Sequence, residues 1–321
     1  MQISDTKTRC LVIGGGGFIG SNLVRQLLVQ GGRKITVLGR SESPHYFLDN
    51  EVEYFQWDSL DYDLVSSLVK DSDEVINLAY ATVPMTSFSD PVTDVLSNLP
   101  FLVNLLKIAS EANLRRLVLV SSGGTVYGNA YELPITETHL TNPISPYGIS
   151  KLSSEKYGIM YHKLKNLPVV IVRPSNPYGR GQRGDLGQGF IAKTIFSILN
   201  RIPIKIFGTQ GTVRDYLYID DLITGIIAAL DYGLSGEIYN IGTGIGTDNL
   251  SIINLLKSIV SNSGYDIKIE ILPERSFDVA VNVLSAARLT YISKWQPQTS
   301  LQKGLLETWQ WNYSATENSR I

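Results

Sequence analysis

The sequence has few of the residues that form covalent cross-links or metal sites. Among its 321 residues there is one cysteine, Cys10, so no disulfide can form within the chain. The three histidines, His45, His139 and His162, are scattered without the spacing of metal ligands. We therefore expect Cys10 to be a buried structural thiol and the protein to bind no metal.

The sequence also lacks an excess of charge of one sign and a long apolar run. It has 28 Lys and Arg against 30 Asp and Glu, a net charge of −2 with the signs interspersed, so nucleic acid is not an expected partner. The first nine residues are polar, and no apolar stretch is expected to reach the ~20 residues that span a bilayer. These features predict a cytoplasmic protein with no signal peptide and no membrane segment.

What the sequence does contain is a glycine-rich segment between two apolar runs. Residues 9–20 read RCLVIGGGGFIG, and helical periodicity continues from 21 to 28, which predicts a strand, a tight turn and a helix. Glycine lets the backbone approach a pyrophosphate, and the free N–H groups of the helix attract its charge. No lysine follows the glycines, which disfavours an ATPase-type phosphate loop and favours a dinucleotide. The expected cofactor contacts here are Gly14, Gly17, Phe18, Ile19 and Gly20.

Short apolar runs alternate with helical segments through the first half of the chain. Strands are expected at 34–38, 53–57, 74–78, 116–120 and 169–172, and helices at 91–112 and 147–164. This alternation predicts an α/β fold with a doubly wound parallel sheet of the Rossmann type over residues 1–174. Residues 175–321 are expected to form mainly a smaller C-terminal α/β substrate lobe, with some segments returning to the first domain. The polar tail after Trp311 is expected to fray.

The candidate chemistry lies where the strand at 116–120 ends and where the next helix begins. Residues 121–128 read SSGGTVYG and place hydroxyls at the carboxyl edge of the sheet, where ligands bind in open α/β folds. Further on, Tyr147 and Lys151 share one helical face at i, i+4. A second pair, Tyr161 and Lys165, lies roughly 21 Å further along the helix, so only one pair can meet a nicotinamide. The position at the helix start favours Tyr147.

A tyrosine next to a lysine can act as a base for alcohol oxidation. A phenol has a pKa of about 10. To lower this pKa by three units, so that the phenolate forms near neutral pH, the protein must stabilise the phenolate relative to the phenol by roughly 4 kcal/mol. A neighbouring ammonium and an oxidised nicotinamide both favour the phenolate. The phenolate then takes the proton of a secondary alcohol as the hydride leaves the carbon.

These motifs together resemble the extended short-chain dehydrogenase/reductase family, and within it the nucleotide-sugar epimerases and dehydratases. The resemblance runs nearly end to end and rests on GGGGFIGSNL at 14–23, SSGGTVYG at 121–128, YGISK at 147–151, RPSNPYGRGQ at 173–182, VRDYLYIDD at 213–221, YNIG at 239–242 and PERSFD at 273–278. It implies a bound NAD, a nucleotide-sugar substrate and a homodimer formed through the helices near 91–112 and 147–164.

The resemblance also implies roles for individual residues. Tyr147 corresponds to the catalytic base, Lys151 to the residue that bonds the nicotinamide ribose, and Asp58 to a contact of the adenine. Further cofactor contacts are expected at Leu78, Ala79 and Asn98. Asn176, Arg214 and Arg275 correspond to the residues that hold the diphosphate, and the two guanidinium groups suit that role.

The sequence departs from the family pattern at Gly123, at Ile13, where a threonine is common before the first glycine, and at the end of the strand at 34–38. Gly123 stands where the catalytic Ser or Thr is usual, so Ser122 or Thr125 must supply that hydroxyl. The strand at 34–38 is followed by Gly39 and Arg40, whereas NAD users of the family carry Asp at the first position. The chain therefore lacks the carboxylate that bonds the ribose 2′-OH of NAD and has the guanidinium of Arg40 beside that position. This pattern fits the 2′-phosphate of NADP, which is the alternative cofactor.

A separate position, aligned through Arg275 and Asp278, concerns the sugar. Asn282 aligns with a position where epimerases restricted to unacetylated hexoses resemble one another in carrying a bulky Tyr. Its smaller amide leaves room for an N-acetyl group, so the pattern predicts that UDP-N-acetylhexosamine is accepted alongside UDP-hexose.

The reaction that these residues favour is C4 epimerisation of a nucleotide sugar through a transient 4-keto sugar. Dehydratases and decarboxylases of the family usually carry an acid just before V-Y-G, where this chain has Gly124 and Thr125. An NADP-dependent reductase of a keto nucleotide sugar is the alternative, because it needs the same Tyr and Lys. A non-catalytic dinucleotide-sensing protein would share the glycine turn but would not need Tyr147 and Lys151.

Overall fold

The computed structural model describes residues 7–46, 48–57, 61–186, 188–261, 263–274 and 279–318. The chain divides into two compact units, each built from several segments. The first unit comprises Met1–Ser122, Ser145–Arg173 and Ile226–Tyr239, and the second comprises Gly123–Ile144, Pro174–Gly225 and Asn240–Ile321.

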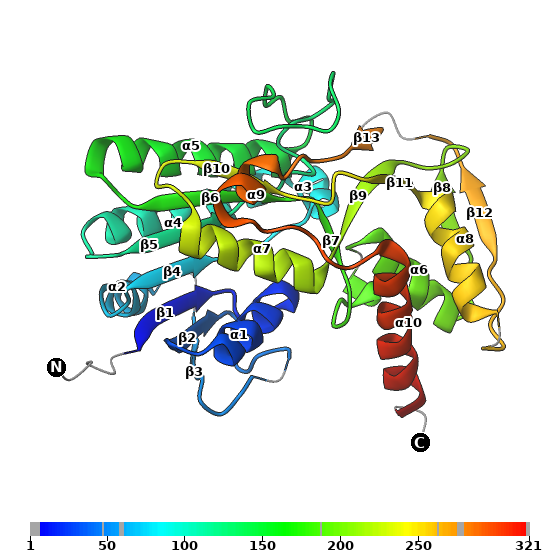
Figure 1. Cartoon of the computed structure of the whole chain (residues 1–321), viewed down its shortest axis with the longest axis horizontal. Coiled ribbons are helices and arrows are strands. Elements are labelled where there is room, and N and C mark those ends of the chain that lie inside the picture. The colour runs from blue at the N-terminus through cyan, green and yellow to red at the C-terminus, as the bar shows by residue number, and fades with distance from the viewer. Residues whose placement is uncertain are drawn as a thin grey trace. The chain divides into compact units, whose positions relative to one another are not determined.

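A seven-stranded sheet with the strand order β10-β6-β5-β4-β1-β2-β3 organises the first unit (Figure 1). Its strands are β1 (Thr8–Ile13), β2 (Arg33–Gly39), β3 (Glu53–Gln56), β4 (Glu74–Asn77), β5 (Arg116–Val120), β6 (Val169–Pro174) and β10 (Ile238–Ile241). The pairs from β6 to β3 are all parallel. The order of these strands reverses beside β1, so the crevice for a ligand lies at the carboxyl ends of β1 and β4. The doubly wound Rossmann-type sheet expected from the sequence is confirmed.

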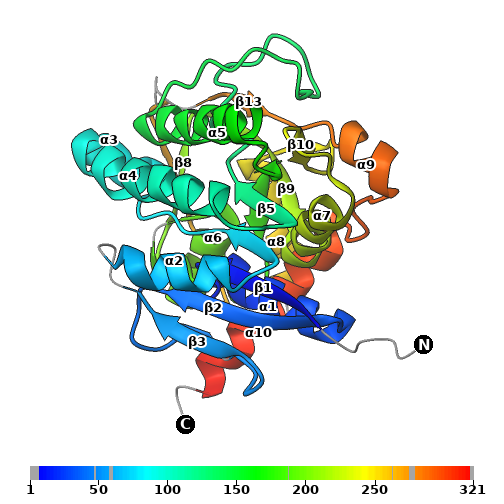
Figure 2. The same ribbon diagram turned by 90° about the vertical axis from the view of Figure 1, so that its left-hand side faces the viewer.

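Helices cover both faces of this sheet, as Figure 2 shows. The helices of this unit are α1 (Phe18–Gln30), α2 (Tyr62–Lys70), α3 (Pro84–Ser89), α4 (Pro91–Ser110) and α5 (Pro146–Lys165). One core cluster joins α2, α4 and α5 to the sheet through side chains such as Leu11, Val65, Leu105 and Leu119. Cys10 points into the structure as expected, with 1% of its surface exposed, and burial raises the pKa of its thiol. The sheet therefore owes its stability to apolar burial on both faces.

Helix α4 corrects one expectation from the sequence. It is long and apolar enough, by length and composition, to cross a membrane, although such a stretch was not expected. Its apolar residues Phe101, Leu102 and Leu105 belong to the core cluster against the sheet. A core helix of a folded domain carries this composition because it is buried on one side, so α4 is no evidence for a membrane segment.

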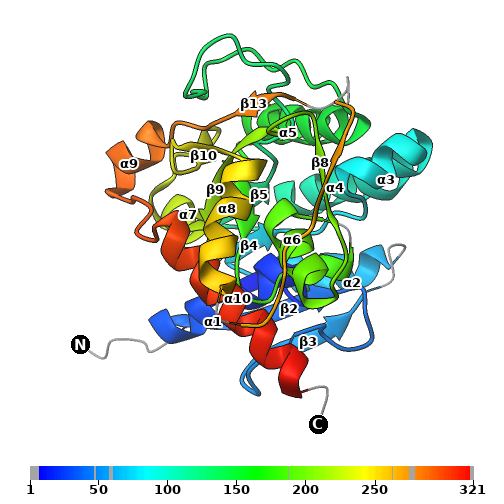
Figure 3. The ribbon, with the colours of Figure 1, turned by 90° about the vertical axis from the view of Figure 1, so that its right-hand side faces the viewer.

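The second unit is built from short strands and three packed helices (Figure 3). One sheet contains β11 (Gly246–Asp248), β9 (Val213–Tyr218), β13 (Val281–Asn282) and β7 (Asn176–Tyr178), and another pairs β8 (Ile204–Phe207) with β12 (Ile269–Leu272). Helices α6 (Phe190–Leu199), α8 (Asn249–Val260) and α10 (Leu301–Asn318) pack on one another. The remaining elements are η1 (Gly184–Leu186), α7 (Ile219–Tyr232), which joins the two units, and α9 (Ala287–Ser293).

The chain end also differs from expectation. Helix α10 continues to Asn318, although the polar tail after Trp311 was expected to fray. Trp309 is buried and stacks on Tyr313, with ring centroids 5.8 Å apart, and Tyr265 meets both rings edge-on. Aromatic packing thus holds the last turns of a segment whose composition is polar.

Candidate active site

The glycine turn after β1 is too tight for side chains at its key positions. A Cβ built on Gly20 would lie 2.3 Å from the carbonyl oxygen of Gly14, and one on Gly14 would lie 2.9 Å from the backbone nitrogen of Ala79. Gly14 also has a φ of +84°, which disfavours any other residue. Ala79 therefore lies directly against the turn, and its predecessor Leu78 donates its backbone N–H to Ile13.

The same turn leaves the start of α1 open for an anion. Gly17 is the residue before the helix and has no side chain to cap it, and Phe18 and Ile19 form the first turn with no acidic residue. The first N–H groups of a helix and its dipole attract negative charge when no side chain competes. The geometry of this segment therefore fits the pyrophosphate of a dinucleotide.

Tyr147 and Lys151 lie in the first two turns of α5. The helix begins here because the Ser145 hydroxyl accepts a hydrogen bond from the Gly148 N–H and because Pro146 occupies the first helical position. The Lys151 side chain crosses to β5, where Nζ donates to the Val120 carbonyl oxygen at 3.0 Å. Its nitrogen lies 5.7 Å from the centre of the Tyr147 ring. The fold thus brings these two candidates together at the carboxyl end of β5.

Burial opposes the charged form of both side chains. It raises the pKa of Tyr147, and the negative charge of Asp94 raises it further. Burial also lowers the pKa of Lys151 to about 7, although Glu155 and Asp94 oppose this shift. The phenolate that the chemistry needs is therefore disfavoured in the protein alone, and a bound cation beside Tyr147 would have to stabilise it.

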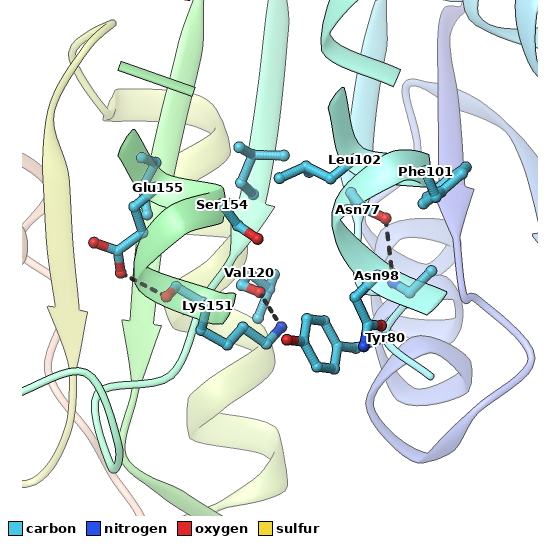
Figure 4. A pocket seen from close by; sticks show the side chains of 13 residues that line it. Asn77, Tyr80, Asn98, Phe101, Leu102, Val120, Lys151, Ser154 and Glu155 are labelled. Atoms are coloured by element: carbon cyan, nitrogen blue, oxygen red, sulfur yellow. Dashed lines mark hydrogen bonds between the residues drawn. The ribbon is translucent and has the colours of Figure 1, made fainter. Parts of the chain in front are cut away.

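Tyr80 completes this centre, and the sequence analysis missed it. Its ring lies under the Lys151 ammonium, 3.9 Å from Nζ to the ring centre, and meets the Tyr147 ring edge-on at 4.9 Å. Its hydroxyl is buried and makes no hydrogen bond of good geometry within the described residues, although the Ser150 hydroxyl lies close enough to lower its pKa. Figure 4 shows Tyr80 and Lys151 side by side in the pocket between α4 and α5. The sequence could have indicated this role, because Tyr80 directly follows the expected cofactor contact Ala79 in the loop after β4.

A buried carboxylate links the segments around this pocket. Asp94 in α4 has no exposed surface and accepts a hydrogen bond from Ser150 at 2.6 Å and another from Thr82. Asn98, one turn later, donates to Thr82 at 3.1 Å and accepts from the backbone N–H of Ala81 at 2.7 Å. The expected cofactor residue Asn98 therefore holds the loop after β4 in place, together with Asp94.

A second buried network lies behind Lys151. Glu155 forms an ion pair with Arg173 of β6 at 2.5 Å, and both side chains are at most 3% exposed. Ser121, at the end of β5, donates to the same carboxylate at 2.5 Å. Glu155 is thus neutralised by Arg173, and the two residues fix α5 against the strand ends from which the site is built.

Three of the expected substrate residues occur in one sheet of the second unit. Asn282 of β13 pairs with Arg214 of β9, and Asn176 lies on β7, which pairs with the next part of β9. The Asn282 side chain is fully buried: its Nδ2 donates to the carbonyl oxygen of Gly123 at 3.0 Å, and its Oδ1 has no partner among the described residues. The fourth expected residue, Arg275, lies outside the described residues.

The remaining candidates are placed as follows. Arg40 directly follows β2 and is exposed, whereas Asp58 lies outside the described residues. Ser122 belongs to the first unit with Tyr147, and Thr125 to the second, where its hydroxyl is buried without a partner in the described segments. Within the described residues no group of three or more acidic, histidine or cysteine side chains could hold a metal ion.

Comparison with known proteins identifies relatives along nearly the whole chain. The model of the NAD dependent epimerase/dehydratase family matches residues 10–242. A UDP-glucose 4-epimerase of Mycolicibacterium smegmatis is 34% identical over 94% of this chain and 97% of its own length. A dTDP-4-dehydro-6-deoxyglucose reductase of Escherichia coli is also 34% identical, over 79% of this chain and 81% of its own length.

Solved structures agree with these sequence relatives. The UDP-glucose 4-epimerase of Thermotoga maritima, solved with UDP-glucose, has a TM-score of 0.90 and 30% identity, and the match covers 96% of this chain and 100% of that one. The UDP-glucose 4-epimerase of Thermus thermophilus, solved with NAD, has a TM-score of 0.87 and 30% identity, with 96% and 100% covered.

Proposed function

Because the chain belongs to the NAD dependent epimerase/dehydratase family, we propose that it is a nucleotide-sugar C4 epimerase with Tyr147 as its base. The observation that carries the proposal is the buried group of Tyr147, Lys151 and Tyr80 at the carboxyl end of β5. The first unit would hold the dinucleotide on its glycine turn, and the second would hold the nucleotide sugar. UDP-glucose 4-epimerases among the relatives support this substrate class.

In this reaction Tyr147, Lys151 and a nearby hydroxyl have different roles. The glycine turn and Lys151 would hold a nicotinamide dinucleotide, which when bound would supply reversible hydride transfer at C4 of the sugar. The Tyr147 oxygen takes the proton of the C4 hydroxyl, so that a 4-keto sugar forms, and gives it back after the sugar has turned its other face. Lys151 holds the ribose of the cofactor, and Ser122 or Thr125 supplies the second hydroxyl at the reacting oxygen.

The experiment that tests this function compares two tyrosines on the same helix. Tyr147→Phe should keep the fold and the bound dinucleotide yet lower turnover by about 10² or more, the range for loss of a general base. Tyr161→Phe is the matched control, since Tyr161 packs against the core cluster. Near-normal turnover in the first variant would refute the assignment. Purified wild type should convert UDP-galactose to UDP-glucose without added cofactor.

The sugar is the finer part of the proposal. Asn282 leaves one amide oxygen without a partner in the described chain, and an N-acetyl N–H would donate to it once the residues that cover this oxygen move aside for the sugar. We expect competition kinetics to show that both UDP-hexose and UDP-N-acetylhexosamine are accepted. The Asn282→Tyr variant should lose the acetylated sugar selectively. If wild type rejects the acetylated sugar, or if the variant loses activity on both sugars equally, Asn282 has only a structural role, through its hydrogen bond to Gly123.

A reductase of a keto nucleotide sugar is the second candidate. The Escherichia coli reductase among the relatives and the exposed Arg40 after β2 favour it. The same Tyr147 would then donate its proton to the keto oxygen. The two functions differ in cofactor use, because a reductase consumes one reduced dinucleotide per product, whereas an epimerase recycles its own.

The assembly and location also belong to this proposal. Helices α4 and α5 carry exposed apolar side chains, among them Val92, Leu96, Ile149, Met160 and Leu164. An apolar face of this kind fits a second copy of the chain, and we assign a homodimer formed through these helices in the cytoplasm.

A further inference from the structure

The last residue of β2, Gly39, leaves no room for an acidic side chain unless Tyr54 moves. Gly39 is buried, and a Cβ built on it would lie 2.3 Å from the hydroxyl oxygen of Tyr54 on the neighbouring strand β3. That hydroxyl is fixed by a hydrogen bond to the carbonyl oxygen of Ser41 at 2.7 Å. The ring of Tyr54 therefore occupies the place where an acidic side chain would meet the ribose 2′-OH.

The same segment presents a free positive charge beside the glycine turn. Arg40 is exposed and makes no ion pair or side-chain hydrogen bond within the described residues. A Cβ on Gly16 of the turn would lie 3.3 Å from Pro44 and 3.4 Å from Tyr54, so this segment borders the cofactor turn. The Ser41 hydroxyl, 3.0 Å from Nε2 of His45, adds a second polar group.

We propose that residues 39–45 form a subsite for the 2′-phosphate of NADP. A guanidinium binds a phosphate through charge and paired N–H donors, and the missing carboxylate removes the group that would repel it. Glu42 is the one acidic residue in this segment, and it is exposed. The inference concerns only how the protein binds its dinucleotide, so it holds whether the sugar is epimerised or reduced.

Binding titrations test the subsite without any enzymatic turnover. Protein freed of bound nucleotide is titrated with NAD and NADP, and with 5′-AMP and 2′,5′-ADP as probes that lack the nicotinamide. We expect wild type to bind NADP at least as tightly as NAD, and 2′,5′-ADP more tightly than 5′-AMP. Arg40→Ala should weaken the binding of the two ligands that carry a 2′-phosphate, NADP and 2′,5′-ADP, by about tenfold to hundredfold and leave the binding of NAD and 5′-AMP unchanged.

A second set of variants tests whether a carboxylate at position 39 favours NAD, as a check that the Arg40→Ala result does not come from an indirect structural change. Tyr54→Ala removes the ring beside Gly39, and Gly39→Asp in that background should shift preference towards NAD relative to Tyr54→Ala alone. The proposal is overturned if wild type binds NAD at least tenfold more tightly than NADP, or if Arg40→Ala weakens all four ligands equally. Near-normal turnover in Tyr147→Phe would refute the proposed base but would leave this inference standing, because the titrations measure dinucleotide binding alone.

Discussion

At the scale of single residues, the buried hydroxyl of Tyr80 lowers the stability of the protein alone but can form a hydrogen bond to a bound ligand. Its buried hydroxyl makes no hydrogen bond of good geometry within the described residues. Burial and the charge of Asp94 raise its pKa, and the nearby Ser150 hydroxyl opposes this shift only in part, so Tyr80 stays a neutral donor. An unsatisfied buried hydroxyl costs about 1–3 kcal/mol, which a bound sugar or ribose oxygen would recover. The usual Ser or Thr position is Gly123 in this chain, so a hydroxyl from another segment gains importance.

We therefore predict that Tyr80→Phe keeps the fold and the ring under Lys151 but lowers kcat by about tenfold, since one hydrogen bond to the reacting ligand is lost. Tyr80→Leu should lose more, because the contact between the ammonium and the ring disappears as well. Steady-state kinetics and dinucleotide affinity are to be measured for both, with the exposed Tyr157→Phe as control. Wild-type kcat in Tyr80→Phe would place this hydroxyl outside the chemistry.

At the scale of elements, the Rossmann sheet was readable from sequence because its signals are local. Apolar runs bounded by turns placed β1 to β6 within a few residues, and the helix expected from residue 147 begins at Pro146 in the structure. The i, i+4 spacing of Tyr147 and Lys151 on that helix was visible for the same reason. What stayed hidden were contacts between elements, such as Tyr80 under Lys151 and Asp94 bonded to Ser150.

The second unit was less readable because its strands are short and their pairing is not local. β13 has two residues, Val281–Asn282, and its register against Arg214 follows from folding rather than from periodicity. Asn282 was noticed only through the family resemblance, and its bond to Gly123 could not be seen in the sequence. The buried pair of Glu155 and Arg173 was missed likewise, because a charged residue in a helix is usually solvated.

At the scale of the whole molecule, helices α4 and α5 carry several large apolar side chains that the described residues leave exposed. Leu96 and Leu164 are 65% and 71% exposed, and Met160 is 39% exposed. The two helices pack against each other in the first unit, and each carries exposed apolar side chains. In a two-fold dimer each residue of such a face is buried twice, once in each copy.

We predict that Leu96→Glu combined with Met160→Glu converts a dimer into monomers. Burying one large apolar side chain is worth about 1.5–3 kcal/mol, and the two-fold axis doubles each loss, so the dissociation constant should rise by about 10² or more. Analytical ultracentrifugation over a range of concentrations measures this, with circular dichroism to show that the fold is kept. Val29→Glu is the matched control, because Val29 is 76% exposed on α1 and away from this surface. A wild type that sediments as a monomer at all concentrations, or a charged variant that stays dimeric, would exclude α4 and α5 as the interface.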